Sequence, residues 1–225
     1  MIPRTLEPEV MDTREEAVDY DSMDHSEVNR RFVDQFITAL EAAGLSSDAK
    51  ILDVGTGTAL IPIELCGRGD YQVTAIDLAT EMLKVGEQNV VAKNLAGRIN
   101  LELVDAKQMR YADNSFDAVM SNSIIHHIPN PHECMSEMVR VLRPGGLMFV
   151  RDLMRPDDVE TLDNIVQTYA GDENEHQQKM FRESLHAALT LDDVREVLAQ
   201  YNLPADWATQ TTDRHWTVHG VLSQP

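Results

Sequence analysis

Short apolar runs alternate with amphipathic segments along the chain from about residue 50 onward. Each apolar run is strand-sized, and the runs predict strands at 50–54, 72–76, 100–104, 116–121 and 147–152. The segments between them carry apolar residues at helical spacing and predict helices near 60–67, 80–94 and 131–142. This alternation is typical of βαβ units around a parallel sheet, so the pattern predicts an α/β fold.

The helix near 131–142 has the clearest boundaries. Asn130 can cap its first turn, Pro131 suits the first helical position, and Glu133 adds an acidic group near the start. Pro144-Gly145-Gly146 then ends the helical pattern. Several independent boundary features therefore agree on this one helix.

The N-terminal part of the chain looks different from the rest. Residues 1–25 are acidic and weakly periodic, whereas Ser26 is predicted to cap a helix that ends at Gly44. The apolar face of that helix consists of Val28, Phe32, Phe36, Ile37 and Leu40. We interpret residues 1–45 as a leader and helix on the substrate side of a main domain, residues 46–225.

Helical segments follow the fifth strand. Stretches near 157–170 and 174–189 form a predicted insertion, residues 153–190, and Thr190 then caps a further helix. Trp207–Thr211 and His215–Val221 are predicted to pair as an antiparallel hairpin. The complete expectation is a Rossmann-like, doubly wound, mostly parallel seven-stranded sheet that closes with this hairpin.

Composition narrows the possible partners. The chain has 225 residues and a formal net charge of −19, which disfavours a nucleic-acid substrate because phosphates require Lys and Arg. Its apolar runs are too short to cross a bilayer and its N-terminus has no secretory pattern, so we expect no membrane association and a cytoplasmic location. Cys66 and Cys134 suggest neither a disulfide framework nor a metal site, and no metal is expected.

A glycine turn follows the first predicted strand. Ile51 to Val54 leads directly into Gly55-Thr56-Gly57, where the absence of a Cβ allows a tight bend and a close approach to a ligand. A dinucleotide fingerprint would place a third glycine at position 60, but this chain has Leu60 there. The turn therefore argues against a nicotinamide cofactor.

Polar residues also end the next strands. Asp77 stands twenty residues after Gly57, Asp105 follows the third strand, and Asn122 follows the fourth. The carboxyl ends of parallel strands share one edge of a sheet, so these groups are predicted to surround one crevice. Asp77 is placed to accept hydrogen bonds from ribose hydroxyls.

Five motifs together carry a family resemblance: LDVGTGTA at 52–59, AIDLATEML at 75–83, VDA at 104–106, FDAVMSNSIIHHIPNP at 116–131 and VLRPGG at 141–146. The chain resembles the class I S-adenosylmethionine-dependent methyltransferases, particularly the small-molecule branch similar to the ubiquinone/menaquinone biosynthesis methyltransferases. One departure is Ala59, where many relatives have a third glycine. Alanine is small, so we expect the binding turn to survive.

The resemblance implies S-adenosylmethionine as cofactor and assigns roles along the motifs. Asp53, Gly55 and Gly57 would surround its methionine part, Asp77 would hold the ribose, Leu78 would pack on the adenine, and Asp105 with Ala106 would face that ring. The predicted cofactor-binding set is completed by Tyr20, Thr56 and Asn122.

Methyl transfer from a sulfonium is an in-line displacement that depends mainly on alignment, and a base is needed only when the acceptor must lose a proton. We select His126 first and His186 second as the catalytic base. Candidate substrate-binding residues are His25, His127, Arg151 and Arg214. Two local alternatives stay open: an Arg151–Asp152 ion pair, and an Asp213–Arg214 pair beside an inward-packed Trp216.

Other functions remain possible on the sequence alone. A SAM-binding protein with chemistry other than methyl transfer and a protein methyltransferase both fit the motifs. An arsenite methyltransferase is disfavoured because only two cysteines are present. The sequence predicts a small-molecule acceptor but leaves its identity, the accepting atom and the oligomeric state undetermined.

Overall fold

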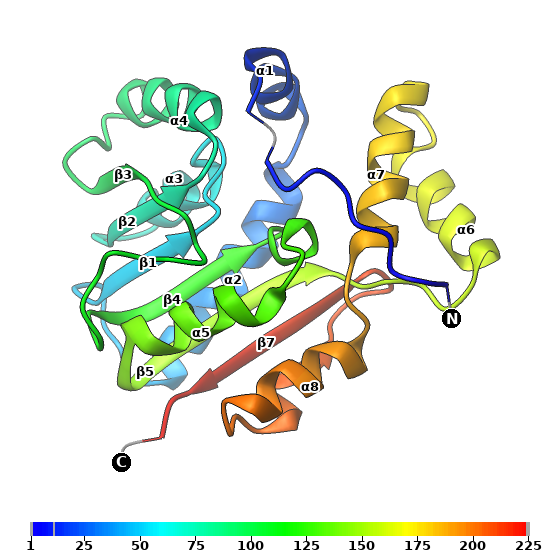
Figure 1. Cartoon of the computed structure of the whole chain (residues 1–225). Helices are drawn as coiled ribbons and strands as arrows, with labels where there is room; N and C mark the ends of the chain where they lie inside the picture. The colour runs from blue at the N-terminus through cyan, green and yellow to red at the C-terminus, as the bar shows by residue number, and fades with distance from the viewer. Residues whose placement is uncertain (1, 11, 224–225) are drawn as a thin grey trace. The chain divides into compact units, whose positions relative to one another are not determined.

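The computed structural model describes residues 2–10 and 12–223. Its strands are β1 (Lys50–Val54), β2 (Gln72–Asp77), β3 (Ile99–Leu103), β4 (Phe116–Asn122), β5 (Leu142–Leu153), β6 (Ala208–Gln210) and β7 (His215–Val221). They form one sheet in the order β3-β2-β1-β4-β5-β7-β6 (Figure 1). β1 pairs in parallel with β2 and β4, β2 pairs in parallel with β3, and β6 pairs antiparallel with β7. The predicted Rossmann-like sheet and closing hairpin are confirmed.

The chain divides into two compact units, each assembled from separate segments. The described residues of the glycine-turn unit fall within Val10–Asn122, Glu133–Val150 and His219–Pro225. Those of the histidine unit fall within Met1–Glu9, Ser123–His132 and Arg151–Val218. The boundary expected from the sequence near residue 45 remains a prediction.

The glycine-turn unit contains α1 (Arg14–Ser22), α2 (Ser26–Ala42), α3 (Leu60–Cys66), α4 (Thr80–Ala92) and most of α5 (Pro131–Val141). In its core, Phe32 and Phe36 of α2 meet Phe149 of β5 edge to face, with ring centroids 5.2 and 5.7 Å apart. Aromatic edges and faces attract because of the ring quadrupole, which adds to the burial of the rings. Of the predicted apolar face of α2, Phe32, Phe36 and Leu40 are buried, Ile37 is partly buried and Val28 is exposed.

The start of the chain differs from the prediction in two ways. Ser26 is the first residue of α2 and not its cap; His25 is at the N-cap position, and the Asp24 side chain accepts the Ser26 amide at 3.0 Å. The predicted leader also contains α1, which begins with a capping box between Thr13 and Glu16. That T-x-x-E spacing was readable in the sequence, but the weak apolar period concealed the helix.

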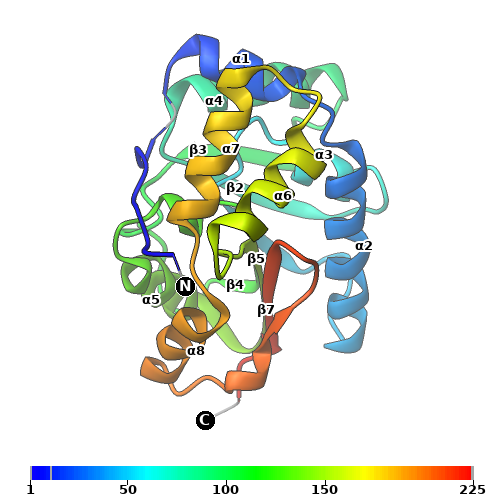
Figure 2. The same cartoon turned by 90° about the vertical axis from the view of Figure 1, so that its right-hand side faces the viewer.

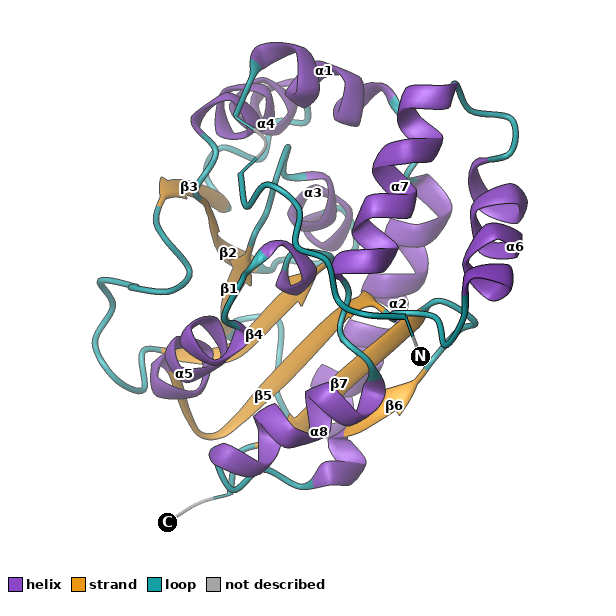
Figure 3. Ribbon diagram, turned by 45° about the vertical axis from the view of Figure 1, so that its right-hand side comes forward, coloured by secondary structure: helices purple, strands orange, loops and turns teal. Residues whose placement is uncertain are grey.

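The histidine unit contains the short turn η1 (Ile125–His127), α6 (Val159–Ala170), α7 (Glu175–Ala187), α8 (Leu191–Gln200) and η2 (Ala205–Trp207). Figure 2 shows α6 and α7 side by side, and their shared core includes Leu162 and Leu185. Thr190 caps α8 as predicted by accepting the Asp193 amide. Figure 3 shows α8 close to β6, and these two elements are in contact.

β5 begins at Leu142, five residues earlier than predicted, and includes Pro144-Gly145-Gly146. The reason is pairing across the sheet: the Gly145 amide donates to the Leu222 carbonyl at 2.8 Å, and the Leu222 amide donates to Gly146 at 2.9 Å. Satisfied backbone groups outweigh the local turn preference of proline and glycine. Within residues 2–10 and 12–223, no helix is long and apolar enough to cross a membrane.

Candidate functional site

The glycine turn, residues 55–59, is held against the end of β2. Gly55 and Gly57 have φ values of 76° and 55°, in the left-handed region that glycine adopts without a Cβ penalty. The Gly55 and Thr56 amides both donate to the Ile76 carbonyl at 2.9 Å. The Gly57 amide donates to Asp77 Oδ2 at 2.7 Å. These bonds fix the turn without using a ligand.

Ala59 occupies the position at which many members of the resembled family have a third glycine. Its φ of 64° is also left-handed, and its side chain is fully buried. A Cβ placed on Gly86 of α4 would lie 3.4 Å from the Ala59 Cβ, so the methyl group faces a helix at close range. The turn therefore keeps its conformation with alanine, and the strain is local.

Polar atoms at the carboxyl ends of β1 and β4 are buried without hydrogen-bond partners among the described residues. They include Asp53 Oδ2, Thr58 Oγ and Asn122 Oδ1. Burial raises the pKa of Asp53 to about 7, against a smaller opposing effect of the Thr56 side chain. Unsatisfied buried polar atoms cost free energy, so their grouping beside one turn indicates a place for a polar ligand.

The other predicted cofactor residues surround the same turn or the neighbouring strand ends. Asp77 accepts the amides of Gly57 and Ala79, and its burial raises the pKa of the carboxyl. Each carboxylate oxygen retains a further lone pair for another donor. Leu78 is 38% exposed, so its side chain is accessible to a ligand. Asp105 is only partly buried and pairs with Lys107 Nζ at 3.0 Å, and Ala106 beside it is also half-buried.

Tyr20 of α1 lies over the glycine turn. A Cβ on Gly57 would be 3.8 Å from the Tyr20 ring, and burial with the charges of Asp77 and Asp53 raises the pKa of Tyr20 to about 12. His25 stacks on Tyr20 with ring centroids 4.5 Å apart, and His25 Nε2 lies 2.9 Å from the Tyr20 carbonyl oxygen. The predicted cofactor residue Tyr20 and the predicted substrate residue His25 thus form one aromatic pair.

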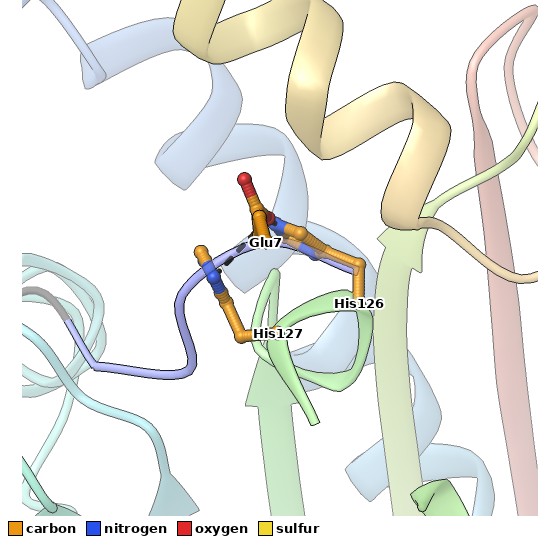
Figure 4. Close-up of side chains that lie close together, drawn as sticks. All are labelled: Glu7, His126 and His127. Atoms are coloured by element: carbon orange, nitrogen blue, oxygen red, sulfur yellow. Dashed lines mark ion pairs between the residues drawn. The ribbon is translucent and has the colours of Figure 1, made fainter. Parts of the chain in front are cut away.

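A second group of polar side chains, the histidine cluster, consists of Glu7, His126 and His127 with Asp152 behind them. Figure 4 shows Glu7 beside both imidazole rings, which both come from η1. His126 Nδ1 lies 2.5 Å from Asp152 Oδ1, and His126 Nε2 lies 3.4 Å from Glu7 Oε1. His127 Nδ1 lies 3.1 Å from the same Glu7 oxygen.

The pKa values of the two histidines in this cluster are shifted in opposite directions. Burial by itself would lower the pKa of His126, but the charges of Asp152 and Glu7 and the Asp152 hydrogen bond outweigh it and raise that pKa. Burial and the neighbouring His126 lower the pKa of His127 to about 4. Burial also raises the pKa of Glu7. His127 is therefore the neutral ring of the pair.

The segment that carries Glu7 is anchored by several hydrogen bonds. Arg4 Nε donates to the Ala187 carbonyl at 2.7 Å and Arg4 Nη2 donates to Ile128 at 3.0 Å. Ser184 Oγ donates to Glu7 Oε2 at 3.1 Å. Sequence reasoning missed Glu7, because nothing distinguishes it from the other acidic residues of the N-terminal segment.

The remaining predicted residues have structural partners in this unit. Buried Arg151 donates from Nε to Thr217 Oγ1 at 3.3 Å, and Asp152 pairs with His126. Arg214 pairs with Asp213 at 3.3 Å and its guanidinium lies 3.3 Å above the Tyr169 ring centre. Trp216 is buried.

His186, the second candidate base, lies at the end of α7. Its Nδ1 atom is buried without a hydrogen-bond partner among the described residues. An imidazole nitrogen without a hydrogen-bond partner can accept a proton. Its catalytic role remains a prediction.

Comparison with known proteins supports the resemblance seen in the motifs. Residues 52–150 match the model of a methyltransferase domain family. The ubiquinone/menaquinone biosynthesis C-methyltransferase UbiE of Geotalea daltonii is 32% identical over 120 residues, which cover 52% of this chain and 51% of that protein. The chain spans about half the length of the curated relatives it matches.

Solved structures share the fold over nearly the whole chain. The plantazolicin methyltransferase BpumL, solved with SAH, superimposes with a TM-score of 0.73 at 14% identity and covers 94% of this chain and 90% of that one. The [4+2]-cyclase SpnF superimposes with a TM-score of 0.60 at 17% identity, covering 87% and 82%.

The sheet order, the glycine turn and the family match all concern the same stretch of sequence. Residues 52–150 match a methyltransferase domain family and are similar in sequence to the ubiquinone/menaquinone biosynthesis methyltransferases, and their strands β1 to β4 belong to the Rossmann-like sheet.

Proposed function

We propose that the chain is an S-adenosylmethionine-dependent methyltransferase that acts on a small molecule. The observation that carries the proposal is the group of unpartnered buried polar atoms of Asp53, Thr58 and Asn122 beside the glycine turn. A ligand with an ammonium group, a carboxylate and ribose hydroxyls would supply partners to carboxylate, hydroxyl and amide oxygens. S-adenosylmethionine carries all of these groups.

The chain's own residues divide the binding work in this proposal. Asp53 would accept the ammonium group, because its buried carboxylate becomes favourable once an opposite charge is adjacent. Asp77 would accept ribose hydroxyls while it holds the Gly57 amide. Leu78 would cover the adenine, whose edge would face Asp105 and Ala106, and Tyr20 would close the turn from the α1 side.

The bound cofactor would supply a methyl group made electrophilic by its sulfonium. The protein's task is then to align the acceptor and to exclude water, which can contribute most of the rate enhancement. Where the acceptor must lose a proton, we propose His126 as the first candidate base and His186 as the second. His126 is supported by Asp152, which fixes its ring through Nδ1.

The proposed methyl acceptor is a small molecule. The net charge of −19 makes a nucleic acid a poor partner. The names of the relatives refer to quinone biosynthesis, which supports a small molecule as the acceptor. We propose His25, His127, Arg151 and Arg214 as substrate contacts, although each already has a partner within the protein. A protein acceptor and the cytoplasmic location remain predictions.

Calorimetry and product analysis test the proposal in two steps. S-adenosylmethionine and its demethylated product should each bind once per chain, and methyl-labelled cofactor should transfer label to a compound in a cell metabolite extract, identified by mass spectrometry. Absence of binding would reject the cofactor assignment. Label transfer only to protein in a whole-cell lysate would replace the small-molecule acceptor with a protein.

A second candidate is a protein that binds the cofactor but performs other chemistry. The structural likeness to SpnF, a [4+2]-cyclase, favours keeping this alternative, since a similar fold is compatible with a different reaction. Tight binding with no labelled product from any extract would support it. Binding of a nicotinamide cofactor in a parallel titration would support an oxidoreductase instead.

A further inference from the structure

Glu7, His126 and His127 direct three ligand atoms toward one point. Glu7 Oε1, His126 Nε2 and His127 Nδ1 all lie within 4.8 Å of one another. Two imidazole nitrogens and a carboxylate oxygen are the donor set that first-row transition metals accept in proteins, and it leaves further coordination positions open. Figure 4 shows the three side chains converging from two separate segments of the histidine unit.

The distances within the cluster match those between ligands of one metal ion. Metal–nitrogen and metal–oxygen bonds of about 2.0–2.2 Å at tetrahedral or octahedral angles place neighbouring ligand atoms roughly 3.0–3.4 Å apart. Glu7 Oε1 lies 3.1 Å from His127 Nδ1 and 3.4 Å from His126 Nε2. These two distances suit ligands of one small dication, and the two histidine nitrogens lie within 4.8 Å of each other.

Two of the three ligand atoms have no hydrogen-bond partner within the described part of the chain. Glu7 Oε1 and His127 Nδ1 are buried and have no hydrogen-bond partner of acceptable geometry among the described residues. Glu7 is 10% exposed, His126 4% and His127 21%, so water reaches them poorly. A buried carboxylate oxygen without a donor is costly, and a bound cation removes that cost.

The atoms behind the three ligands form the outer shell that metal sites require. His126 presents Nε2 because its Nδ1 faces the buried carboxylate of Asp152. The Pro8 carbonyl oxygen accepts a hydrogen bond from the His127 ring, and Ser184 Oγ donates to the second oxygen of Glu7. Carboxylates and carbonyls in these positions fix the ring orientation of metal-bound histidines and increase their basicity.

We infer that Glu7, His126 and His127 bind a first-row divalent transition-metal ion, such as Zn²⁺, and leave coordination positions open to an oxygen or nitrogen ligand. Two buried carboxylates, Glu7 and Asp152, supply negative charge there. The nearby cation Arg4 is already engaged with the carbonyl oxygens of Ala187 and Ile128. The contacts and burial that support this metal site do not rest on the proposed methyl transfer.

Metal binding and the proposed base role compete for the same atom of His126. Nε2 cannot coordinate a metal and accept a proton at once, whereas Nδ1 is occupied by Asp152. If the site holds a metal, proton removal passes to another group, such as His186. Zn²⁺ coordination by His126 Nε2 would therefore exclude His126 as the base.

The experiment is a titration of the full, untagged chain with Zn²⁺ after treatment with a chelator, followed by calorimetry, and a parallel titration with Co²⁺ read by visible absorption. We expect one site per chain, with Co²⁺ bands typical of mixed nitrogen and oxygen ligands. Glu7→Gln and His127→Gln should each weaken Zn²⁺ binding roughly 100-fold or more, and Asp152→Asn roughly 10- to 100-fold.

Matched controls separate this site from adventitious binding. Glu175→Gln and His176→Gln change exposed residues of α7 of the same types and should leave affinity and stoichiometry unchanged. Circular dichroism and thermal unfolding confirm that each variant is folded. Equal Zn²⁺ binding by the wild type and the folded Glu7→Gln and His127→Gln variants, or no stoichiometric binding by the wild type, would overturn the inference. Neither outcome depends on S-adenosylmethionine binding or on turnover.

Discussion

The glycine turn and the histidine cluster both contain buried polar atoms without hydrogen-bond partners among the described residues, but they are built differently. The region around the glycine turn consists mostly of one continuous motif, residues 53–59, together with the ends of neighbouring parallel strands. The histidine cluster joins Glu7, His126, His127 and Asp152, which three distant segments supply. A contiguous motif can therefore be recognised from the sequence, whereas a site assembled from isolated distant residues cannot.

The two regions also differ in how their charges are balanced. Asp53 is buried near Asp77, and burial first and the charge of Asp77 second raise its pKa to about 7. Asp152 is equally buried, yet its neighbour His126 and the amides of Leu153 and Ile125 outweigh burial and lower its pKa. The first carboxylate is suited to an incoming charged ligand, and the second to holding a neighbouring ring in place.

The largest expected effect is the loss of turnover in His126→Gln, which changes only the histidine cluster. If this ring assists transfer, kcat should fall roughly 100-fold or more, while the dissociation constant of S-adenosylmethionine stays near the parent value. Steady-state kinetics and calorimetry measure the two effects separately. His176→Gln, an exposed histidine on α7, should change neither quantity. A kcat within a few-fold of the parent enzyme would favour catalysis by alignment alone.

The converse change is Asp77→Ala, which affects the glycine turn alone. Loss of a charged acceptor for ribose hydroxyls should weaken S-adenosylmethionine binding by about 1.5–3 kcal/mol, and Zn²⁺ affinity should not change. Because Asp77 also holds the Gly57 and Ala79 amides, thermal unfolding must show that the variant is folded. The exposed Asp172→Ala is the control. An unchanged dissociation constant in a folded variant would remove Asp77 from the binding site.

A smaller effect is expected on the affinity for S-adenosylmethionine when pH changes the protonation of Asp53. If the ionised carboxylate binds the cofactor's ammonium group, protonation below its pKa of about 7 competes with binding. Affinity should then fall about tenfold between pH 8 and pH 6, and Asp53→Asn should weaken binding and remove this dependence. Asp77 and Tyr20 are the other titratable groups recorded near Asp53. A pH-independent affinity in the parent protein would contradict this role.

The same carboxyl should affect folding stability with a defined sign. Its pKa is raised in the folded protein, so its stabilising contribution is complete below the unfolded pKa of about 4 and is lost as pH rises through about 7. Without cofactor, Asp53→Asn should therefore unfold at a higher denaturant concentration than the parent protein at pH 8, with little difference at pH 4. The opposite order at pH 8 would show that ionised Asp53 stabilises the turn.

The smallest effect should come from Ala59→Gly. Glycine removes the cost of a left-handed alanine, about 1–2 kcal/mol, but it also removes a buried methyl group worth about 0.8 kcal/mol and makes the unfolded chain more flexible. We expect the free energy of unfolding to change by less than about 1 kcal/mol, measured by urea unfolding. A loss above about 2 kcal/mol would mean that contact with Gly86 dominates over backbone strain.

The sequence alone determined most of the fold and one of the two regions. Its periodicity predicted the parallel strands β1 to β4, the helices α3 to α8 and the closing hairpin, because period and caps act over a few residues. The spacing of Gly57 and Asp77 predicted their proximity, now seen as a 2.7 Å hydrogen bond. Parallel strands bring their carboxyl ends to one edge, so strand order is sufficient for this result.

Only the tertiary structure decided the rest, because those features depend on which distant residues meet. β5 begins at Leu142 because Gly145 and Gly146 pair with Leu222, a partner that no local propensity can identify. The pairing of Asp152 with His126, and the position of Glu7 beside both histidines, likewise require the folded chain. A sequence shows which side chains are available, but hydrogen bonds and burial in the folded state determine which of them act together.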